Sequence, residues 1–383
     1  MLLIYSILFV FCLSLSSCDK AKPPTPTPTP VPVPILPPLW DANALRGAWV
    51  TNVASTAMDS RANIKACVAN CKLAGINNIF MVVYNNARTC YPSNVMDTLL
   101  GVRIKENFAG RDPLQEMIEE AHAQSIKVHA WFEYGFASSF QANGGPIIAA
   151  RPQWAARDVN NNVVVKNDFF WLNAFHPGPQ EYMINLFKEV TTNYNVDGVQ
   201  GDDRLPACPT SSGYDTYTSA LYQAENGVPP PTNNLDAAWV QWRAKKLNVF
   251  LKRLRTAVKT IKPNIQFTMS PSPYPWGLDN YLQDWPTWVD SAWVDAIIPQ
   301  CYRYNITDYN ATINQQKVFY RNPNVPFYPG VLLKVANYTP DDIFLKAMIA
   351  KNKSAGFKGE VFFFYEGVKD KMTFFQNQYP YIP

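Results

Sequence analysis

Acidic side chains stand at the ends of three segments that have the composition of buried strands. Asp202 and Asp203 end the segment that begins at Asp197, Glu133 ends a second segment, and Glu366 follows a third. Glycoside hydrolysis requires two carboxyl groups, one protonated to assist departure of the leaving group and one ionised as nucleophile or base. We therefore expect one of the adjacent aspartates to act with one of the glutamates, and all four residues are candidate catalytic residues.

The two adjacent aspartates are expected to differ in role. Neighbouring residues of a strand point to opposite sides, so one carboxylate would face the reaction centre and the other its neighbours. Clustered like charges raise one pKa and provide an acid that is usable near neutral pH. A Ca²⁺ or Mg²⁺ site of Asp202 and Asp203 with Asp215 or Asp279 is the alternative, because these cations prefer oxygen ligands. We predict neither a bound metal nor a cofactor.

Each glutamate also has a non-catalytic interpretation. Glu133 could be a buried acid paired with Arg46 or Arg88, and Glu366 could lie at the surface of the last loop. The choice depends on whether one fold brings the ends of these segments together.

Short β-rich segments alternate with longer amphipathic segments along the chain. This alternation is typical of a parallel sheet with helical crossovers, and we count eight strands, the number that closes an α/β (β/α)8 TIM barrel. Helix signals support the crossovers: Asp112 is an N-cap acid followed by Pro113, and residues 235–261 carry an apolar stripe opposite Lys and Arg. The predicted strands are residues 46–53, 76–84, 127–134, 197–202, 265–270, 294–302, 327–333 and 360–365.

Polar and aromatic residues at the C-terminal ends of these strands are the candidate substrate-binding residues, because TIM barrels place their active sites there. Aromatic faces with hydroxyl or indole donors suit sugar rings, which have apolar C–H patches and polar edges. The long connections 134–170 and 205–234 both follow strands, so we expect them on the same face. The predicted binding residues are Trp49, Asn52, Tyr84, Asn85, Trp131, Tyr134, Arg204, Gln300, Tyr302 and Lys334, and further rim aromatics are Trp154, Trp171, Tyr274, Trp276 and Tyr365.

These strand-end motifs resemble the glycosyl hydrolase-like 10 family of bacterial TIM barrels. The sequence RGAWV at 46–50 matches the family's first strand, HAW at 129–131 its third, DGVQGDD at 197–203 its fourth, and PQCY at 299–302 its sixth. The resemblance covers residues 45–367. It implies hydrolysis of a bacterial polysaccharide, with peptidoglycan glycan strands as one known substrate class.

The resemblance also bears on the roles of the acids. The spacing from Asp197 to Asp202 is similar to that around the nucleophile of alpha-amylase-type barrels, which favours Asp202 as nucleophile. The general acid of those enzymes has no counterpart at Ser270, so we expect the acid at Glu133 or Glu366. Four departures from the common family pattern imply a divergent branch: Gln200 replaces His, Gly201 a bulky apolar residue, Arg204 an aromatic residue, and Glu133 the usual Asn.

The start of the chain and its charge bear on location and partners. Residues 1–18 resemble a bacterial lipoprotein signal in which Cys18 becomes lipidated; an ordinary cleaved signal peptide is the alternative, and both export the protein. Residues 19–40 are a Pro/Thr-rich linker that favours polyproline II, and residues 41–383 would form the catalytic domain. We expect a lipid-anchored protein of the cell envelope that contacts the membrane through its lipid alone. The net charge of +4 is spread along the chain, so no nucleic-acid surface is expected.

Five cysteines follow the linker. Cys67 and Cys71 lie four residues apart on an expected helix, where they form an apolar stripe more readily than a metal site. An exported protein permits a disulfide among Cys90, Cys208 and Cys301, and the pairing is left open.

Two functions remain open from sequence. We predict a glycoside hydrolase that acts on a polysaccharide or oligosaccharide through its carboxylates. A non-catalytic glycan-binding TIM barrel displayed on the cell surface is the alternative, because it would use the same aromatic residues and carboxylates. An esterase is disfavoured, since the chain lacks a Gly-X-Ser-X-Gly elbow. The oligomeric state is left open.

Overall fold

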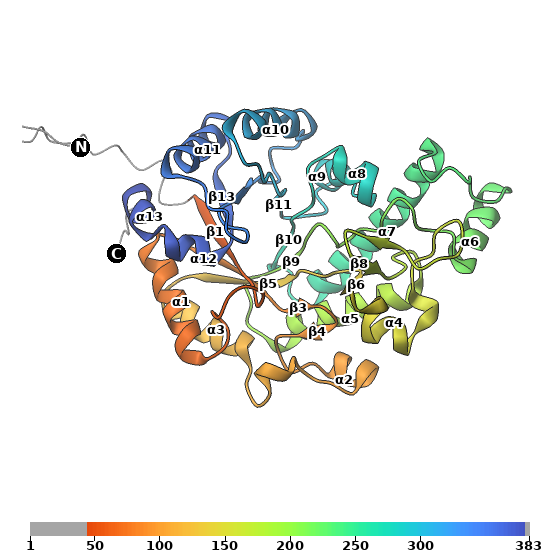
Figure 1. Ribbon diagram of the computed structural model, residues 1–383, viewed down its shortest axis with the longest axis horizontal. Helices are drawn as coiled ribbons and strands as arrows, with labels where there is room; N and C mark the ends of the chain where they lie inside the picture. The colour runs from red at the N-terminus through yellow and green to blue at the C-terminus, as the bar shows by residue number, and fades with distance from the viewer. Residues whose placement is uncertain (1–43, 380–383) are drawn as a thin grey trace, which may run out of the picture. The chain divides into compact units, whose positions relative to one another are not determined.

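Eight parallel strands form a barrel in the computed structural model of the protein, which describes residues 44–379 (Figure 1). The predicted signal, the lipidated Cys18 and the linker lie outside the described residues. Each predicted strand overlaps an observed one. The strands are β1 (Leu45–Val50), β2 (Asn78–Val82), β5 (Lys127–Phe132), β9 (Gly198–Gly201), β10 (Gln266–Met269), β11 (Ala296–Ile297), β12 (Gly330–Leu332) and β13 (Gly359–Phe363).

The order of the strands confirms the TIM barrel. Neighbours in the sheet run β11, β10, β9, β5, β2, β1, β13, β12, so consecutive barrel strands pair in parallel. Parallel bridges from Ile297 to Phe327 and from Gln300 to Gly330 join the two remaining edges. All strand C-terminal ends therefore meet at one rim of a closed barrel.

Helices return the chain outside the barrel. The predicted signals act as expected: Asp112 accepts a hydrogen bond from the backbone N–H of Gln115 at 3.1 Å, and Pro113 begins its helix. These helices are α1 (Arg61–Leu73), α3 (Pro113–His122), α5 (Pro177–Asn193), α7 (Ala237–Ile261), α8 (Trp276–Tyr281), α9 (Trp285–Asp290), α10 (Ile306–Phe319), α11 (Asp342–Ser354), α12 (Tyr365–Asp370) and α13 (Met372–Gln378).

Close packing fills the barrel below its rim. A Cβ atom at Gly198 would lie 2.1 Å from Nδ1 of His129, so only glycine fits there. The His129 ring stacks on Phe80 with centroids 4.4 Å apart, and its Nε2 lies 2.9 Å from Oδ1 of Asn78. Burial lowers the pKa of His129 to about 4, so this histidine is a neutral core residue.

The connection after β5 contains an additional sheet. Three antiparallel strands lie in the order β6, β8, β7, where the sequence predicted a long loop. Strands of two to four residues are too short to show the alternation that identifies a strand in sequence. The elements of the connections are β3 (Tyr84–Asn85), β4 (Arg88–Thr89), α2 (Asn94–Leu100), β6 (Ala137–Phe140), α4 (Gly145–Ala150), β7 (Val165–Lys166), β8 (Phe169–Trp171) and α6 (Thr216–Asn226), with 3-10 turns at Glu106–Phe108, Ala142–Gly144 and Pro152–Trp154.

The cysteines of the described chain are all buried and free. Cys67 and Cys71 face inward from α1, as the sequence predicted. Cys90, Cys208 and Cys301 form no disulfide within residues 44–379. Over the same range, no helix is both long and apolar enough to cross a membrane.

Candidate active site

The ends of β5 and β9 place two acids next to each other. These strands are neighbours in the barrel, and Phe132 is in register with Gly201. The residues that follow, Glu133 and Asp202, therefore leave adjacent strands at the same height. Both belong to the rim at which active sites of this fold form.

Arg204 connects the acids of this rim. Its Nη1 atom lies 3.1 Å from Oδ1 of Asp203 and 3.4 Å from Oδ2 of Asp202. The same nitrogen donates to the backbone carbonyl oxygen of Glu133 at 3.0 Å. One guanidinium thus holds both strand ends together: it pairs with the carboxylates of Asp202 and Asp203 and contacts Glu133 through its backbone carbonyl oxygen.

Asp202 is enclosed by hydrogen-bond donors. Its Oδ1 accepts from the backbone N–H of Arg204 at 3.0 Å, and its Oδ2 accepts from the indole of Trp131 at 3.2 Å. Only 1% of the residue is exposed. Its backbone carbonyl oxygen accepts from the side-chain amide of Gln283 at 3.0 Å. These contacts fix the carboxyl group and favour its ionised form.

Burial opposes the ionisation of Asp202. It raises the pKa of Asp202 well above the ordinary value, and the charge of Asp203 raises it further, whereas Arg204 lowers it. The net direction is upward. Asp202 therefore takes up a proton closer to neutral pH than an exposed aspartate does.

Glu133 shares this property. Its carboxylate accepts a short hydrogen bond from the side-chain amide of Asn85. Burial raises the pKa of Glu133, against the opposing influence of Arg204 and of the Asn85 hydrogen bond. The pairing with Arg88 considered from sequence is not formed, because Arg88 pairs with Glu106 at 2.9 Å. Arg46, the other suggested partner, lies near the N-terminal end of β1, away from this rim.

Aromatic residues form the floor below the acids. The indole of Trp49 donates to Oε1 of Gln200 at 2.8 Å, and its ring centroid lies 6.3 Å from Trp131 and 6.5 Å from Tyr302. Burial raises the pKa of the Tyr302 phenol, and the charges of the two aspartates raise it further. Tyr302 is therefore within electrostatic reach of the acids.

Two residues that the sequence did not single out complete the cluster. The guanidinium of Arg204 lies over the rings of Phe169 and Tyr134, at 4.6 and 5.5 Å from their centroids. Phe169 comes from β8 of the additional sheet, and Gln283 comes from the turn between α8 and α9. In the sequence, the aromatic run at 169–171 is the only signal for Phe169, and no pattern marks Gln283.

The structure places Glu366 and Lys334 in other contacts. Glu366 accepts from the hydroxyl of Ser55 at 2.7 Å and pairs with Lys369 of the same helix, α12. Lys334 pairs with Asp370. The contacts of Asp202 and Glu133 include neither Glu366 nor Lys334. The acids that the structure brings together are therefore Glu133 and the two aspartates.

Three further predicted binding residues differ in their surroundings. Tyr84 is completely buried and its ring packs against Tyr182 of α5, with centroids 6.1 Å apart. Gln300 donates its amide to the backbone carbonyl oxygen of Ser270 at 3.3 Å. The amide oxygen and nitrogen of Asn52 are buried and have no hydrogen-bond partner in the protein. The hydroxyl of Tyr84 is likewise buried without a hydrogen-bond partner, so unpaired polar atoms occur at two of the three positions.

The acid cluster does not form a metal site with the residues suggested from sequence. Asp215 instead caps α6 by accepting from the backbone N–H of Thr218 at 2.9 Å. The guanidinium of Arg204 occupies the position between Asp202 and Asp203. Within residues 44–379, no three or more His, Cys, Asp or Glu side chains converge in a way that could hold a metal ion.

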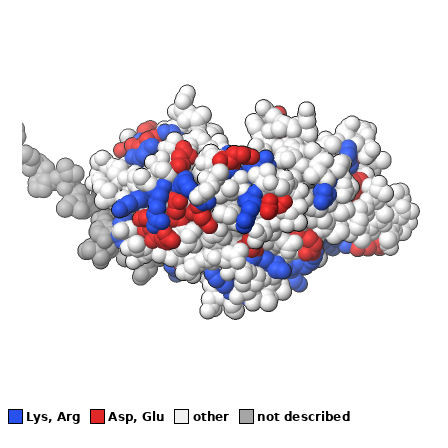
Figure 2. All heavy atoms as spheres, turned by 90° about the horizontal axis from the view of Figure 1, so that it is seen from below, with Lys and Arg blue, Asp and Glu red and all other residues white. Residues whose placement is uncertain are grey.

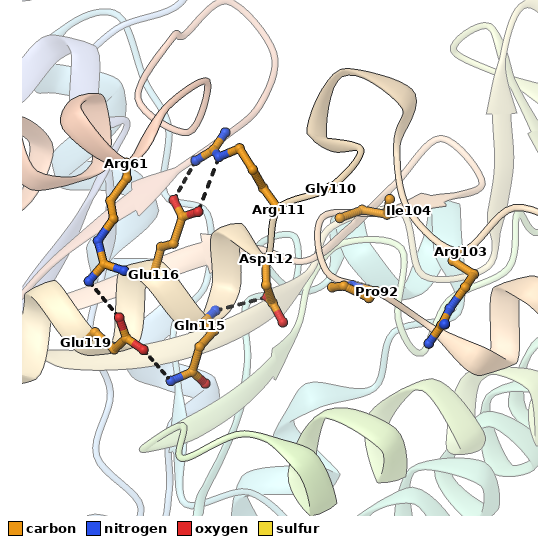
Figure 3. Close-up of a pocket in the computed structure, with 10 residues that line it drawn as sticks. All are labelled: Arg61, Pro92, Arg103, Ile104, Gly110, Arg111, Asp112, Gln115, Glu116 and Glu119. Carbon is orange, nitrogen blue, oxygen red and sulfur yellow. Dashed lines mark hydrogen bonds and ion pairs between the residues drawn. The ribbon is translucent and has the colours of Figure 1, made fainter.

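A second charged region lies between α1 and α3. It is a pocket of about 560 Å³, shown in Figure 3. Its charges pair with one another: Arg61 with Glu119 at 2.6 Å, and Arg111 with Glu116 at 2.5 Å. On the face seen in Figure 2, Lys and Arg side chains likewise lie beside Asp and Glu side chains. We call this region the outer pocket.

Similar proteins of known sequence are glycosyl hydrolases. The chain is 28% identical to Glycosyl hydrolase DigH of Escherichia coli (strain K12) over 294 residues, which cover 69% of this chain and 64% of DigH. It is 22% identical to Glycosyl hydrolase YngK of Bacillus subtilis (strain 168) over 324 residues, which cover 77% of this chain and 60% of YngK. The match thus spans less than two thirds of the length of these relatives.

Solved structures share the fold. The glycoside hydrolase domain of PgaB (BpsB) from Bordetella bronchiseptica matches with a TM-score of 0.65 and 12% identity, over 88% of this chain and 98% of that domain. The catalytic domain of the Paenibacillus polymyxa beta-amylase matches with a TM-score of 0.63 and 9% identity, over 88% of this chain and 97% of that domain. The family model Glycosyl hydrolase-like 10 matches residues 44–343. The chain belongs to the glycosyl hydrolase-like 10 family.

Proposed function

We propose that the protein is a glycoside hydrolase that acts on a bacterial polysaccharide through Asp202 and Glu133. The observation that carries this proposal is the cluster at the rim of the barrel, where Arg204 pairs with Asp202 and Asp203 and contacts the backbone of Glu133. The family and the fold support it. Peptidoglycan glycan strands are the first substrate class to test.

The surroundings of the two acids suggest their roles. Hydrogen bonds to a carboxylate favour its ionised form, so the group that accepts fewer of them keeps a proton more readily. Asp202 accepts from Trp131 and from the backbone N–H and guanidinium of Arg204, whereas Glu133 accepts from Asn85. Glu133 is therefore the proposed general acid, and Asp202 the ionised nucleophile or base.

The reaction follows from this assignment. Glu133 gives its proton to the glycosidic oxygen while the bond from that oxygen to the anomeric carbon breaks. Asp202 either removes a proton from the water that attacks the anomeric carbon, or attacks that carbon itself. In the second case water, which gives a proton to Glu133, then breaks the bond between Asp202 and the sugar and restores both acids. Asp203, whose side chain is 27% exposed, pairs with Arg204, and its carboxylate favours the positive charge that develops on the sugar ring. Trp49 and Trp131 bound the site from below.

The test is the release of reducing ends. The protein is incubated with denuded peptidoglycan strands and a panel of polysaccharides, beside Asp202→Asn and Glu133→Gln. The matched control is Asp290→Asn, a surface acid paired with Arg321. Wild type and control are expected to release new reducing ends, and the two rim variants to lose about 10²–10⁴-fold of that activity.

Glu366→Gln is expected to retain far more activity than Glu133→Gln. Tight binding by wild type with no product from any glycan would replace hydrolysis with glycan binding as the function.

We further propose that the protein is exported and anchored by a lipid on Cys18, ahead of the catalytic domain at 41–383. The apolar run at 1–17 before that cysteine and the Pro/Thr-rich residues 19–40 support this proposal. An extended linker of ~3.1 Å per residue would hold the domain on the order of 60 Å from the membrane, within reach of a neighbouring polymer. Cys18→Ala is expected to move the protein from the membrane fraction to the soluble fraction; an unchanged distribution would contradict the lipid anchor.

A further inference from the structure

Trp276 is the exposed tryptophan of the described chain. It is 50% exposed, whereas Trp49 and Trp131 of the active-site floor are 1% and 3% exposed. No other tryptophan among residues 44–379 falls in the exposed class. An exposed indole offers a flat apolar face beside a polar N–H, which suits the C–H face and polar edge of a sugar ring.

A rigid stack supports Trp276 from behind. Its ring centroid lies 5.5 Å from that of Tyr281, which in turn lies 5.5 Å from that of Trp171. Tyr281 is 6% exposed, and its hydroxyl accepts from the side-chain amide of Asn167 at 2.8 Å. The indole of Trp276 is therefore the outer end of a fixed aromatic row. Because the side chain is already held in place, it loses little conformational freedom when a ligand binds to its free face.

The helix that carries Trp276 is fixed to the acid cluster. Gln283, which follows α8, holds the backbone carbonyl oxygen of Asp202. Burial raises the pKa of Tyr281 to about 12, and the charge of Asp203 contributes to the rise, so the phenol lies within electrostatic reach of that acid. Trp276 and Tyr281 thus belong to the same connection whose Gln283 contacts the backbone of Asp202.

Two connections join to form a wall at this side of the rim. Lys166 of β7 donates to Oδ1 and to the carbonyl oxygen of Asn280, at 2.9 and 3.1 Å, and its ammonium lies 4.7 Å from the centroid of Tyr281. The connection after β5 therefore meets the connection after β10. In the barrel, β9 lies between β5 and β10, so the wall stands beside the end of β9 and its two aspartates.

We propose that Trp276 is the platform of a distal sugar-binding subsite. One pyranose ring of a polysaccharide would stack its C–H face on the exposed indole while a bond further along the chain lies at the acids. The inference rests on the proposed function, and it adds that the enzyme prefers long glycans to short fragments. A protein partner at the same indole is the competing outcome.

Binding is measured first, in proteins that do not turn over. Asp202→Asn and, as a second background, Glu133→Gln are titrated with denuded peptidoglycan strands and with their disaccharide unit. Adding Trp276→Ala is expected to weaken binding of the strands about tenfold, with no change for the disaccharide, and Trp276→Phe is expected to restore most of the affinity. Ile343→Ala, which removes an 83% exposed side chain from α11, is the control and leaves both affinities unchanged.

Turnover separates this inference from the proposed function. With Trp276→Ala in the active protein, KM for long strands is expected to rise about tenfold at unchanged kcat. Equal affinity of the Trp276→Ala and parent proteins for strands would overturn the subsite, as would an absence of glycan binding by both backgrounds. If binding depends on Trp276 and on strand length but wild type releases no reducing ends, the subsite stands and hydrolysis fails.

Discussion

The rim of the barrel and the outer pocket are both rich in charge, but they arrange it differently. In the outer pocket, Arg61 pairs with Glu119 and Glu120, and the side chains of Arg61 and Glu119 are 54% and 43% exposed. At the rim, Arg204 pairs with Asp202 and Asp203; its side chain is 17% exposed and Asp202 is 1% exposed. Water therefore screens the charges of the first cluster but not that of Asp202.

This difference is the one expected between a structural charge cluster and a catalytic one. Exposed ion pairs contribute about 0–1 kcal/mol each and leave the acids with ordinary behaviour or a lowered pKa. Glu119 shows this, since hydrogen bonds from Gln115 and Arg61 lower its pKa. The pKa values of Glu133 and Asp202 are raised by burial instead. Acids kept in surroundings that oppose their charge are typical of catalytic sites.

The largest expected effect is on catalysis at the rim. Asp202→Asn removes the carboxylate proposed to meet the anomeric carbon, and we expect kcat to fall by about 10²–10⁴-fold. The release of reducing ends from denuded glycan strands measures the loss. Activity within tenfold of wild type would show that Asp202 is a structural acid despite its raised pKa. The rim and the outer pocket would then both be structural charge clusters.

Removal of the shared cation should affect both stability and pH dependence. Arg204→Met leaves Asp202 and Asp203 without their partner, and breaking a buried pair in this way is expected to lower the free energy of unfolding by roughly 3 kcal/mol. Arg204 lowers the pKa values of Asp202 and Glu133, so its removal raises both and moves the acidic limb of the pH–rate profile to higher pH. Urea unfolding and the pH dependence of kcat/KM measure the two effects. Arg111→Met is the matched control, because it should leave the pH–rate profile in place.

The two regions should also respond to pH with opposite signs. The folded state raises the pKa of Asp202, so it binds more protons than the unfolded state, and stability is lost as pH rises from about 3.9 through the folded pKa. The folded state lowers the pKa of Glu119, so its contribution is lost as pH falls. Urea titrations from pH 3 to 8 measure the free energy of unfolding. Asp202→Asn should reduce its loss with rising pH, by at most about 1.4 kcal/mol per pH unit. Glu119→Gln should reduce its loss with falling pH. A steeper loss with rising pH in Asp202→Asn would contradict the assignment.

The sequence predicted much of this arrangement because the relevant signals are local. Eight β-rich segments fixed the barrel, and the end of each segment placed Glu133 and Asp202 at one rim. Contacts between distant segments were not predictable, because no local pattern encodes them. Gln283 reaches Asp202 from the turn after α8, and Phe169 reaches Arg204 from a strand of three residues. Among the four candidate acids, only the observed contacts separate Glu366, which pairs with Lys369, from the cluster at Arg204.

The smallest expected effect lies in the outer pocket. Glu116→Gln removes the acid beside Arg111, which keeps its hydrogen bonds to the backbone carbonyl oxygens of Met58 and Asp59, at 3.2 and 2.8 Å. Because the guanidinium stays partly paired and open to water, we expect a loss of about 0.5 kcal/mol in the free energy of unfolding, and no change in kcat or in its pH dependence. Urea unfolding and reducing-end assays on the same preparation measure both. A change in the pH–rate profile would show that the outer pocket communicates with the rim, so the two regions could no longer be treated as independent.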